Sequence, residues 1–381
     1  MRILIVLNYF YPYVSGVSEY ARSLAEALAG EHEVTILTGQ HESDLPKQEV
    51  VDGYKIVRSP ILFRLDKGYL SPALLTEFRR LQKQADVVNL HLPMLESSLL
   101  AALTSKPLAL TYQCDMAYEG SLLSKLAVWG VRRSCAMALK QADQVATLSL
   151  DYAESSPFLQ PHTAKTVEVW PPNRFGKRAL NSVDSLPDAP GSVAPGEIRI
   201  GFVGRFVKEK GIDVLLDSIT RLSDLPVKLM LVGDFAGVAG GSIYDDVKSK
   251  IDGLGNRVEL LGKLDDDALE AFYGNIDILA LPSVNRFEAF GMVQVEAMGF
   301  GAIPVASDMP GVRATIRTTG IGFLARPGDA EALANAFRSA IEQRNTLSRK
   351  TVAERTLDMQ AHSFGEAYEA VFKAAQNAAD A

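Results

Sequence analysis

Two glutamates lie eight positions apart in the segment EAFGMVQVEAMGFGAIPVASDMPGV, which runs from Glu288 to Val312. Gly291 falls between them, where a helix can begin, so we expect Glu288 in the entry loop and Glu296 inside a helix that runs to about Met298. The start of a helix carries free backbone N–H groups and about half a positive charge, which suits a phosphate. Both carboxylates would flank this helix end and accept hydrogen bonds from hydroxyl groups beside the phosphate.

A second segment with suitable chemistry is GRFVKEKGID, from Gly204 to Asp213. It follows an apolar strand pattern, and its last residues open a helix. Arg205 offers a planar fork of N–H groups and Lys210 offers a point charge, and together they suit a diphosphate. The alternative interpretation is a surface ion pair between Arg205 and Glu209.

Short apolar runs alternate with longer helical patterns along the chain, which predicts parallel sheets buried on both faces. One helix is expected over Ser18–Leu28, ending at Gly30. The stretch from Asn173 to Glu197 is rich in Pro, Ser, Gly and Asp and predicts a linker between two α/β domains, with a ligand cleft between them. The expected strands are Ile3–Leu7, Val34–Thr38, Tyr54–Val57, Val87–Leu90, Leu108–Tyr112, Gln144–Leu148, Ile198–Gly204, Val227–Gly233, Val258–Gly262, Asp277–Ser283 and Gly301–Ser307.

The composition is that of an ordinary globular protein of two domains, with 381 residues, 47% hydrophobic and 22% charged. The net charge of −7 argues against nucleic-acid binding. Cys114 and Cys135 form no CxxC pair, so neither a zinc site nor a disulfide framework is expected, and both are interpreted as buried thiols. No signal peptide or membrane-spanning run is evident, which predicts a protein of the cytoplasm or of the inner membrane face.

The segment from Glu288 to Val312 resembles the E-x7-E signature of retaining glycosyltransferases with the GT-B fold, family 4 (glycosyl transferases group 1). The similarity covers nearly the whole chain and is densest from Ile198 to Gly322. It implies two Rossmann-like, doubly wound α/β domains that face each other across a cleft. The expected division is an acceptor-side domain (1–175), a linker (176–196), a nucleotide-sugar domain (197–360) and a C-terminal helix that packs back on the first domain (361–381).

The resemblance also implies an activity: transfer of a hexosyl unit from a GDP- or UDP-sugar to a hydroxyl of a lipid-linked or polysaccharide acceptor, with retention and without a metal or another cofactor. Arg205 and Lys210 would hold the diphosphate and stabilise the leaving group, and Glu288 would bind the donor sugar. Glu296 would bind the nucleotide ribose. Backbone groups would bind the rest of the donor, the diphosphate at Phe290, Gly291 and Met292 and the base at Lys263 and Leu264.

The first domain carries the weaker signals. Gly16, in the loop before the first helix, resembles a residue near the donor phosphates and acceptor, although the family often has glycine at the position of Ser15 as well. Gln113 stands where the family often has histidine, and an amide cannot act as a general base. Asp115 and His91 are further candidates for acceptor contact, and each has a purely structural alternative.

Four cations and no acidic residue occur between Leu122 and Lys140, together with Trp129 and several leucines. This pattern predicts a basic amphipathic helix that rests on an anionic membrane surface. A core-packed helix with a solvated basic edge is the alternative. The cations are Lys125, Arg132, Arg133 and Lys140.

The acidic run Asp265-Asp266-Asp267 is interpreted as a helix N-terminal cap rather than a metal site. The sequence leaves one main rival function open, a sugar-nucleotide-binding protein that has lost catalysis, which the exchange at Gln113 favours. A dinucleotide oxidoreductase would require a G-x-G-x-x-G motif, which neither domain supplies after its first strand. A GT-B-type sugar-nucleotide epimerase is disfavoured by the family-4 segment. The base, the sugar and the acceptor stay open.

Overall fold

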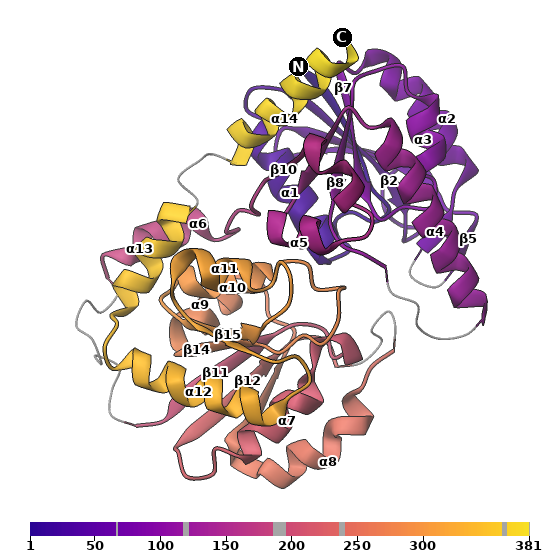
Figure 1. The fold of residues 1–381 in the computed structure, drawn as a ribbon. Coiled ribbons are helices and arrows are strands. Elements are labelled where there is room, and N and C mark those ends of the chain that lie inside the picture. Colours follow the sequence, from indigo (N-terminus) through magenta and orange to yellow (C-terminus); the bar gives the residue numbers. More distant parts are fainter. Residues whose placement is uncertain (66–67, 117–121, 186–195, 236–240, 360–363, 381) are drawn as a thin grey trace. The chain divides into compact units, whose positions relative to one another are not determined.

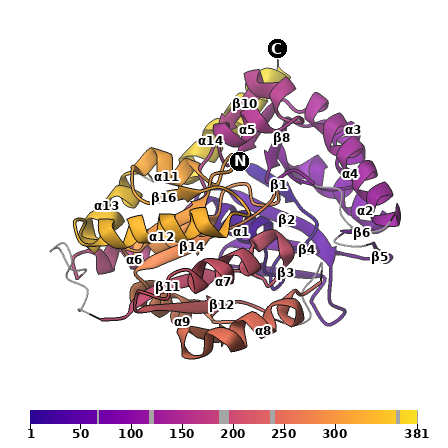
Figure 2. The same cartoon turned by 60° about the horizontal axis from the view of Figure 1, so that its bottom comes forward.

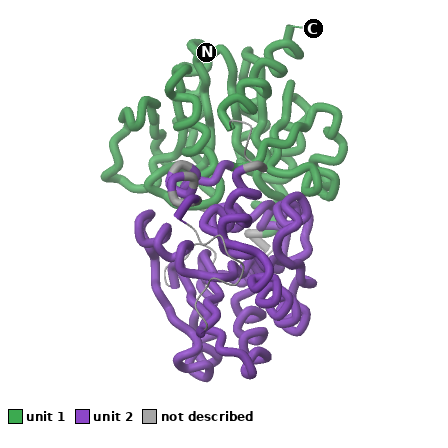
Figure 3. Tube along the Cα trace, turned by 90° about the vertical axis from the view of Figure 1, so that its left-hand side faces the viewer, with its two compact units in different colours: residues 1–171, 362–381 green, residues 172–361 purple. Residues whose placement is uncertain are grey.

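The computed structural model describes residues 1–65, 68–116, 122–185, 196–235, 241–359 and 364–380. The chain divides into two compact units, residues 1–171 with 362–381 and residues 172–361 (Figure 3). Each unit has a parallel sheet with helices packed against it, so the two doubly wound α/β domains expected from the sequence are present.

The first unit alternates strands and helices (Figure 1). Its described strands are β1 (Arg2–Val6), β2 (Glu33–Gln40), β3 (Gln48–Val51), β4 (Tyr54–Pro60), β5 (Phe63–Leu65), β6 (Gly68–Leu70), β7 (Val87–Leu92), β8 (Leu108–Tyr112), β9 (Gln144–Thr147) and β10 (Thr166–Glu168). Its described helices are α1 (Gly16–Leu28), α2 (Pro72–Leu81), α3 (Ser97–Leu103), α4 (Leu122–Gln141), α5 (Leu150–Ser155) and α14 (Phe364–Ala379).

The main sheet of the first unit has the order β10-β9-β8-β7-β1-β2-β4-β3. Its pairs are parallel except for β3 with β4 at the edge, which are antiparallel. All positions of β7 and β8 are buried, as expected for strands with both faces covered. The order of the sheet reverses between β1 and β7, and ligands of such sheets bind beyond the carboxyl ends of the strands at this kind of switch point.

The second unit repeats the pattern with a smaller sheet. Its described strands are β11 (Ile198–Val203), β12 (Val227–Val232), β13 (Val258–Gly262), β14 (Ile278–Leu281), β15 (Ile303–Ser307) and β16 (Phe323–Ala325). Its described helices are α6 (Gly176–Val183), α7 (Ile212–Thr220), α8 (Tyr244–Leu254), α9 (Asp266–Asn275), α10 (Met292–Gly299), α11 (Ala314–Thr319), α12 (Ala330–Arg344) and α13 (Arg349–Met359).

The sheet of the second unit has the order β13-β12-β11-β14-β15-β16, with all described pairs parallel. Its switch point lies between β11 and β14. Helices α7 and α12 pack side by side over a core that contains Phe202, Leu216 and Phe337 (Figures 1 and 2). The strands expected from the sequence are all present, with ends that differ by a few residues. The sequence pattern does not predict β3, β5, β6, β10 and β16, which are only three or four residues long.

The stretch expected to be a linker is partly helical, which is a correction. Helix α6 forms inside it and packs on α10 and α13 of the second unit. Phe175 and Ala179 are buried in an apolar cluster there with Tyr273 and Phe300, so this short helix gains apolar burial that its polar composition hides. The boundary between the units accordingly falls at residues 171 and 172 rather than 175 and 176.

The C-terminal helix α14 belongs to the first unit. It packs against α1, β8 and β9, and its apolar face is buried through Tyr368, Val371, Phe372 and Ala375. The Tyr368 hydroxyl lies 2.9 Å from Thr111 Oγ1 and donates to the Tyr20 hydroxyl at 3.0 Å. These contacts join the last helix of the chain to the centre of the first sheet.

Candidate active site

The loops that follow β11 and β14 meet at the switch point of the second sheet. Residues Lys208–Lys210 form one 3-10 turn, and Gly211 then starts α7 with φ of +65°. A Cβ atom at Gly211 would lie 2.1 Å from the Pro282 carbonyl oxygen, and Val284 N donates to Glu209 O at 2.9 Å. Only glycine permits this close approach, which brings the two charged segments found in the sequence together.

Lys210 and Glu288 form a direct hydrogen-bonded ion pair through Nζ and Oε2. The Ser283 hydroxyl also donates to Glu288 Oε2, at 3.3 Å. The two charged side chains are 20% and 15% exposed, so water screens this pair less than a surface pair. A lysine has three N–H donors and a carboxylate about four acceptor positions, so the pair retains donors and acceptors for a ligand.

Arg205 lies in the same loop as Lys210 but makes a looser contact. Its Nη2 atom is 3.9 Å from Glu209 Oε1, and the side chain is 41% exposed. The ion pair named as the alternative interpretation is therefore present, at a distance that contributes little. The predicted role of Arg205 at the diphosphate stays a prediction.

Helix α10 begins at the predicted position, with Gly291 as its N-cap residue at φ of +81°. A Cβ atom there would lie 2.2 Å from Leu281 Cδ2, so the turn into the helix requires glycine. Gln294, which the sequence analysis did not single out, stabilises the turn: its side-chain amide donates to Phe290 O at 2.9 Å and to Val312 O at 3.0 Å. The backbone at Phe290, Gly291 and Met292 is thereby held at the helix start, where its N–H groups suit an anion.

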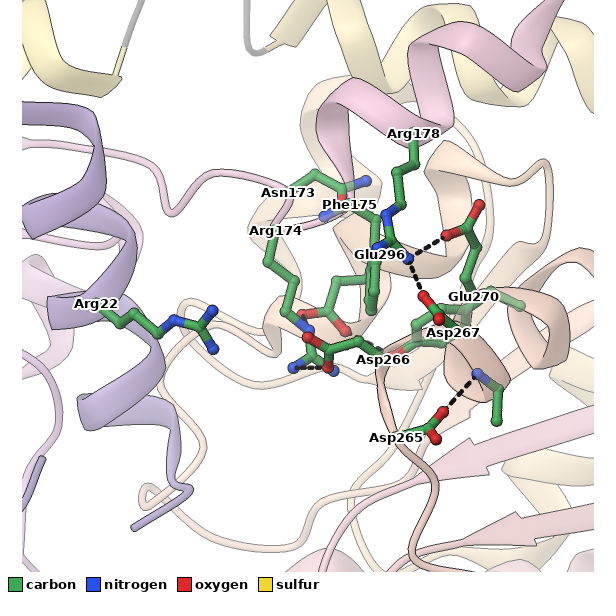
Figure 4. A network of polar contacts seen from close by, with 12 residues as sticks. Arg22, Asn173, Arg174, Phe175, Arg178, Asp265, Asp266, Asp267, Glu270 and Glu296 are labelled. Carbon is green, nitrogen blue, oxygen red and sulfur yellow. Dashed lines mark hydrogen bonds and ion pairs between the residues drawn. The ribbon is translucent and has the colours of Figure 1, made fainter. Parts of the chain in front are cut away.

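Glu296 lies more than one turn into α10 and is buried. The Tyr273 hydroxyl of α9 donates to its Oε2 at 2.6 Å, and Arg174 Nε lies 3.2 Å from its Oε1 (Figure 4). Burial raises the pKa of Glu296, while Arg174 and the hydrogen bond from Tyr273 lower it. The two glutamates thus have separate surroundings: Glu288 meets a lysine in the loops, and Glu296 faces α9 and the segment before α6.

The acidic run is a helix cap, as predicted. Asp265 is the N-cap residue of α9, and its carboxylate accepts from Ala268 N at 2.9 Å. Asp266 and Asp267 also bind arginines, which the sequence did not indicate. The pairs are Arg174 with Asp266 at 3.3 Å and Arg178 with Asp267 at 2.6 Å (Figure 4).

Just before this acidic run, Lys263 is exposed and Leu264 packs half-buried against the second unit's core. Their predicted backbone contact to a base stays a prediction.

Ser15 has a clear role in the first unit. It is the N-cap residue of α1: its hydroxyl accepts from Ser18 N at 3.2 Å, and Ser18 Oγ accepts from Ser15 N at 2.7 Å. Relative to alanine, such a side-chain cap stabilises a helix by about 1 kcal/mol, so Ser15 stabilises the start of α1 through side-chain hydrogen bonds that glycine lacks. Gly16 is the first residue of the helix and has open space around it.

His91 and Gln113 form a buried pair at the ends of β7 and β8. The Gln113 Nε2 atom lies 3.3 Å from His91 Nδ1. Burial lowers the pKa of His91 to about 3, so its ring is neutral at physiological pH. With Nδ1 accepting from the Gln113 amide, the ring proton is on Nε2, which has no hydrogen-bond partner among the described residues. The pair therefore presents a buried N–H donor to whatever ligand reaches it.

The Asp115 carboxylate makes two structural hydrogen bonds that the sequence did not predict. Its Oδ1 atom accepts from the Tyr112 hydroxyl at 2.7 Å and from the Ser156 hydroxyl at 2.7 Å. The carboxylate therefore ties the end of β8 to the residue after α5. These contacts support the structural alternative named for Asp115.

An aromatic and acidic cluster near the carboxyl ends of β1, β2 and β7 was not predicted. The Tyr9 ring stacks on Tyr13 with centroids 4.8 Å apart and meets Tyr69 and His41 edge-on. Glu96 is buried nearby, and neither of its carboxylate oxygens has a hydrogen-bond partner of standard geometry. Burial raises the pKa of Glu96, although the backbone near Glu96 and Ser71 partly opposes this. The residues come from three loops and from strand β6, which are far apart in the sequence, so no local sequence pattern predicts the cluster.

Helix α4 covers the predicted basic segment and combines exposed cations with exposed apolar side chains. Lys125, Arg133 and Lys140 are exposed, Leu126 is 67% exposed and Trp129 is 57% exposed. Arg132 instead turns inward, donates to Met116 O at 3.2 Å and lies over the Phe158 ring. None of the helices in the described residues is long and apolar enough to cross a membrane.

The structure also shows the burial of the two cysteines and the grouping of potential metal ligands. Cys135 is buried, and burial raises its pKa to about 11, whereas Cys114 is only half-buried, which corrects one of the two expected buried thiols. Within the described ranges, one group of potential metal ligands comes together, Glu31, His32 and Glu369 on the first unit. There His32 Nε2 lies 3.0 Å from Glu369 Oε1, a partly buried contact that is an ion pair when the ring is protonated.

Comparison with known proteins identifies the family of this chain. The family described as "Glycosyl transferases group 1" matches residues 189–356, and the "Glycosyl transferase 4-like domain" matches residues 15–171. The phosphatidyl-myo-inositol mannosyltransferase of Mycobacterium leprae is 26% identical over 362 residues, which covers 88% of this chain and 86% of that protein.

Two further proteins extend the comparison. The D-rhamnosyltransferase WbpZ of Pseudomonas aeruginosa is 25% identical over 348 residues, 87% of this chain and 85% of that protein. Among solved structures, the sucrose-phosphate synthase of Thermosynechococcus elongatus has the same fold, with a TM-score of 0.72, 22% identity and coverage of 98% and 99%. Because the two family models match both halves of the chain in order and the structural neighbours have the GT-B fold, the chain belongs to the group 1, family 4 type of GT-B glycosyltransferases.

Proposed function

We propose that this glycosyltransferase moves a hexosyl unit from a nucleoside diphosphate sugar to an acceptor hydroxyl with retention at the anomeric carbon. The observation that carries the proposal is the Lys210–Glu288 pair beside the start of α10, at the switch point of the second sheet. A cation, a carboxylate and the backbone N–H groups of a helix start lie together there. This is the combination that a sugar diphosphate requires.

Chemically, the departing diphosphate gains negative charge as the bond to the sugar breaks. Lys210, Arg205 and the N–H groups at the start of α10 would stabilise this charge, and such preorganised donors are the main source of catalysis in many enzymes. Glu288 would bind sugar hydroxyls and also fix the Lys210 ammonium. No metal or cofactor enters the proposed reaction.

The proton of the acceptor hydroxyl would pass to the departing phosphate oxygen. Gln113 cannot accept a proton near neutral pH, and the neutral His91 ring has a pKa of about 3, so it is a very weak base. Asp115 already accepts two hydroxyl hydrogen bonds. The candidates in the first unit therefore suit binding of hydroxyl groups better than proton transfer.

A nucleotide-release assay tests the activity. UDP- and GDP-linked glucose, mannose and N-acetylhexosamines are first screened by thermal shift, and release of the nucleoside diphosphate is then measured with and without candidate acceptors. Release that depends on an acceptor, with a product that keeps the anomeric configuration, supports the proposal. Binding without hydrolysis or transfer would instead favour a sugar-nucleotide-binding protein that has lost catalysis.

The acceptor proposed is lipid-linked or a growing polysaccharide, in keeping with relatives named for transfer to phosphatidyl-myo-inositol or of rhamnose. Exposed Lys125 and Arg133 beside Trp129 on α4 support a contact with anionic lipid. Each cation near such a surface contributes about 1 kcal/mol, so replacing both by glutamine should weaken binding to phosphatidylglycerol vesicles by about 30-fold. Turnover with a water-soluble acceptor should be unchanged, and equal vesicle binding by the variant would exclude this contact.

A further inference from the structure

Arg174 sits on a segment that is fixed directly to α10. Its neighbour Asn173 donates from Nδ2 to Val295 O at 3.1 Å and accepts from Phe175 N at 2.8 Å through Oδ1. The Arg174 guanidinium lies over the Phe175 ring, 4.6 Å from its centre. These contacts hold the arginine at the buried carboxylate of Glu296, 122 positions along the chain, in the network of Figure 4.

The acceptor positions of Glu296 are only partly used. A carboxylate has about four lone-pair positions. The Tyr273 hydroxyl occupies one on Oε2 at 2.6 Å, and Arg174 Nε lies against Oε1 at 3.2 Å. About two positions remain, one on each oxygen, which matches the two neighbouring hydroxyls of a ribose.

The charged form of Glu296 depends on few groups. Of the described charged and titratable groups packed around α10, Arg174 lies before α6, and Tyr273 and Asp266 lie on α9. Arg178 on α6 binds Asp267 and Glu270 instead, and Arg349 on α13 donates to the carbonyl oxygens of Ile276 and Phe300. Burial and Asp266 both disfavour the charged carboxylate, so Arg174 is the cation that opposes them.

We propose that Arg174 is a positioning residue for the donor nucleotide: it keeps Glu296 charged and orients it so that two acceptor positions face the ribose hydroxyls. The inference rests on the proposed function for its ligand, a ribonucleoside diphosphate. Arg174, in the segment that precedes α6, would thereby contribute to recognition of the ribose. Without Arg174, the pKa of Glu296 would rise further, and the protonated carboxyl would lose an acceptor position.

Two measurements on the full chain test this. In the ligand-free protein, the 13C signal of the Glu296 carboxyl, assigned with Glu296→Gln, is titrated in the wild type, Arg174→Gln and Arg174→Lys. Separately, the dissociation constants of UDP, GDP and their 2′-deoxy forms are measured between pH 5.5 and 8.5. Arg178→Gln is the matched control, because it removes a neighbouring arginine that does not touch Glu296.

In Arg174→Gln we expect the Glu296 titration to move to higher pH and the ribonucleotide to bind about tenfold more weakly at the acid end of this pH range, with recovery as the pH rises. Preference for the ribo over the 2′-deoxy form should fall in parallel. Arg174→Lys should restore most of the affinity, and Arg178→Gln should resemble the wild type.

A purely structural role would give a loss of affinity that is the same at all pH values. That result, or an unmoved Glu296 titration in Arg174→Gln, would overturn the inference. If the wild type binds neither nucleotide, the proposed function fails. The titration of the ligand-free protein then still decides whether Arg174 keeps Glu296 charged.

Discussion

The carboxyl ends of the two sheets carry different chemistry. In the second unit, the polar residues are charged and paired across loops, Lys210 with Glu288 and Arg174 with Glu296. In the first unit, the pair at the strand ends is neutral: His91 contacts Gln113 in a buried environment that lowers the pKa of the histidine to about 3. One edge suits a charged diphosphate, and the other suits hydroxyl groups.

This difference supports the roles proposed for the two sheet edges. Charge that develops on a leaving group requires fixed cations and N–H dipoles, and the second unit supplies both. Recognition of a neutral sugar requires donors, acceptors and aromatic faces, and the first unit supplies these at His91, Gln113, Glu96 and the stacked Tyr9 and Tyr13. The next four experiments separate the two edges, from the largest expected effect to the smallest.

Glu288→Ala should abolish transfer, with a loss of more than about 1,000-fold in turnover, while the nucleoside diphosphate still binds. The variant removes both a sugar contact and the carboxylate that holds Lys210. Turnover by nucleotide release and binding by calorimetry give the two values. Full transferase activity in this variant would refute the role of Glu288.

Lys210→Met should lower turnover by about 100- to 1,000-fold, because it removes one fixed cation from the departing diphosphate. It also leaves Glu288 without its cation, so nucleoside diphosphate affinity should fall as well. The matched variant Lys208→Met removes a lysine of the same turn and should leave turnover near that of the wild type. Equal losses in the two variants would show that the lysines act only through net charge.

His91 predicts a pH-dependent stability of the first unit. Its pKa falls from an ordinary value of 6.5 to about 3 in the folded chain, so between these values the unfolded state binds a proton that the folded state does not. Stability from this group is complete above pH 6.5 and is lost on acidification, by about 1 kcal/mol per pH unit. Denaturant unfolding at pH 7 and pH 5 should show a smaller difference in His91→Gln, and the same difference in both proteins would assign the slope to other groups.

Gln113→Ala should have the smallest effect, a loss of less than about tenfold in acceptor kcat/KM that is constant with pH, because an amide contributes only hydrogen bonds here. Donor affinity should be unchanged. A loss greater than about 100-fold, or one that varies with pH, would place proton transfer at this edge and remove the contrast between the two units.

Much of the site in the second unit could be predicted. The start of α10 at Gly291, the turn at Lys210 and the cap at Asp265 all follow from local signals within a few residues. The contacts of Arg174 and Tyr273 with Glu296 could not, since they join residues 122 and 23 positions apart. The helix α6 was also missed, because its stability comes from packing on α10 and α13 rather than from its composition.

The sequence by itself determined the alternation of strands and helices, the glycine at the helix start and the residue types that suit a diphosphate, because these depend on local periodicity, backbone freedom and charge. Only the tertiary structure decided which charges pair. In the folded chain, Lys210 pairs with Glu288 and Arg174 pairs with Glu296. Burial makes His91 a neutral hydrogen-bond donor rather than a base. The physical reason is that pairing and burial depend on the order of strands in a sheet, which short-range patterns do not specify.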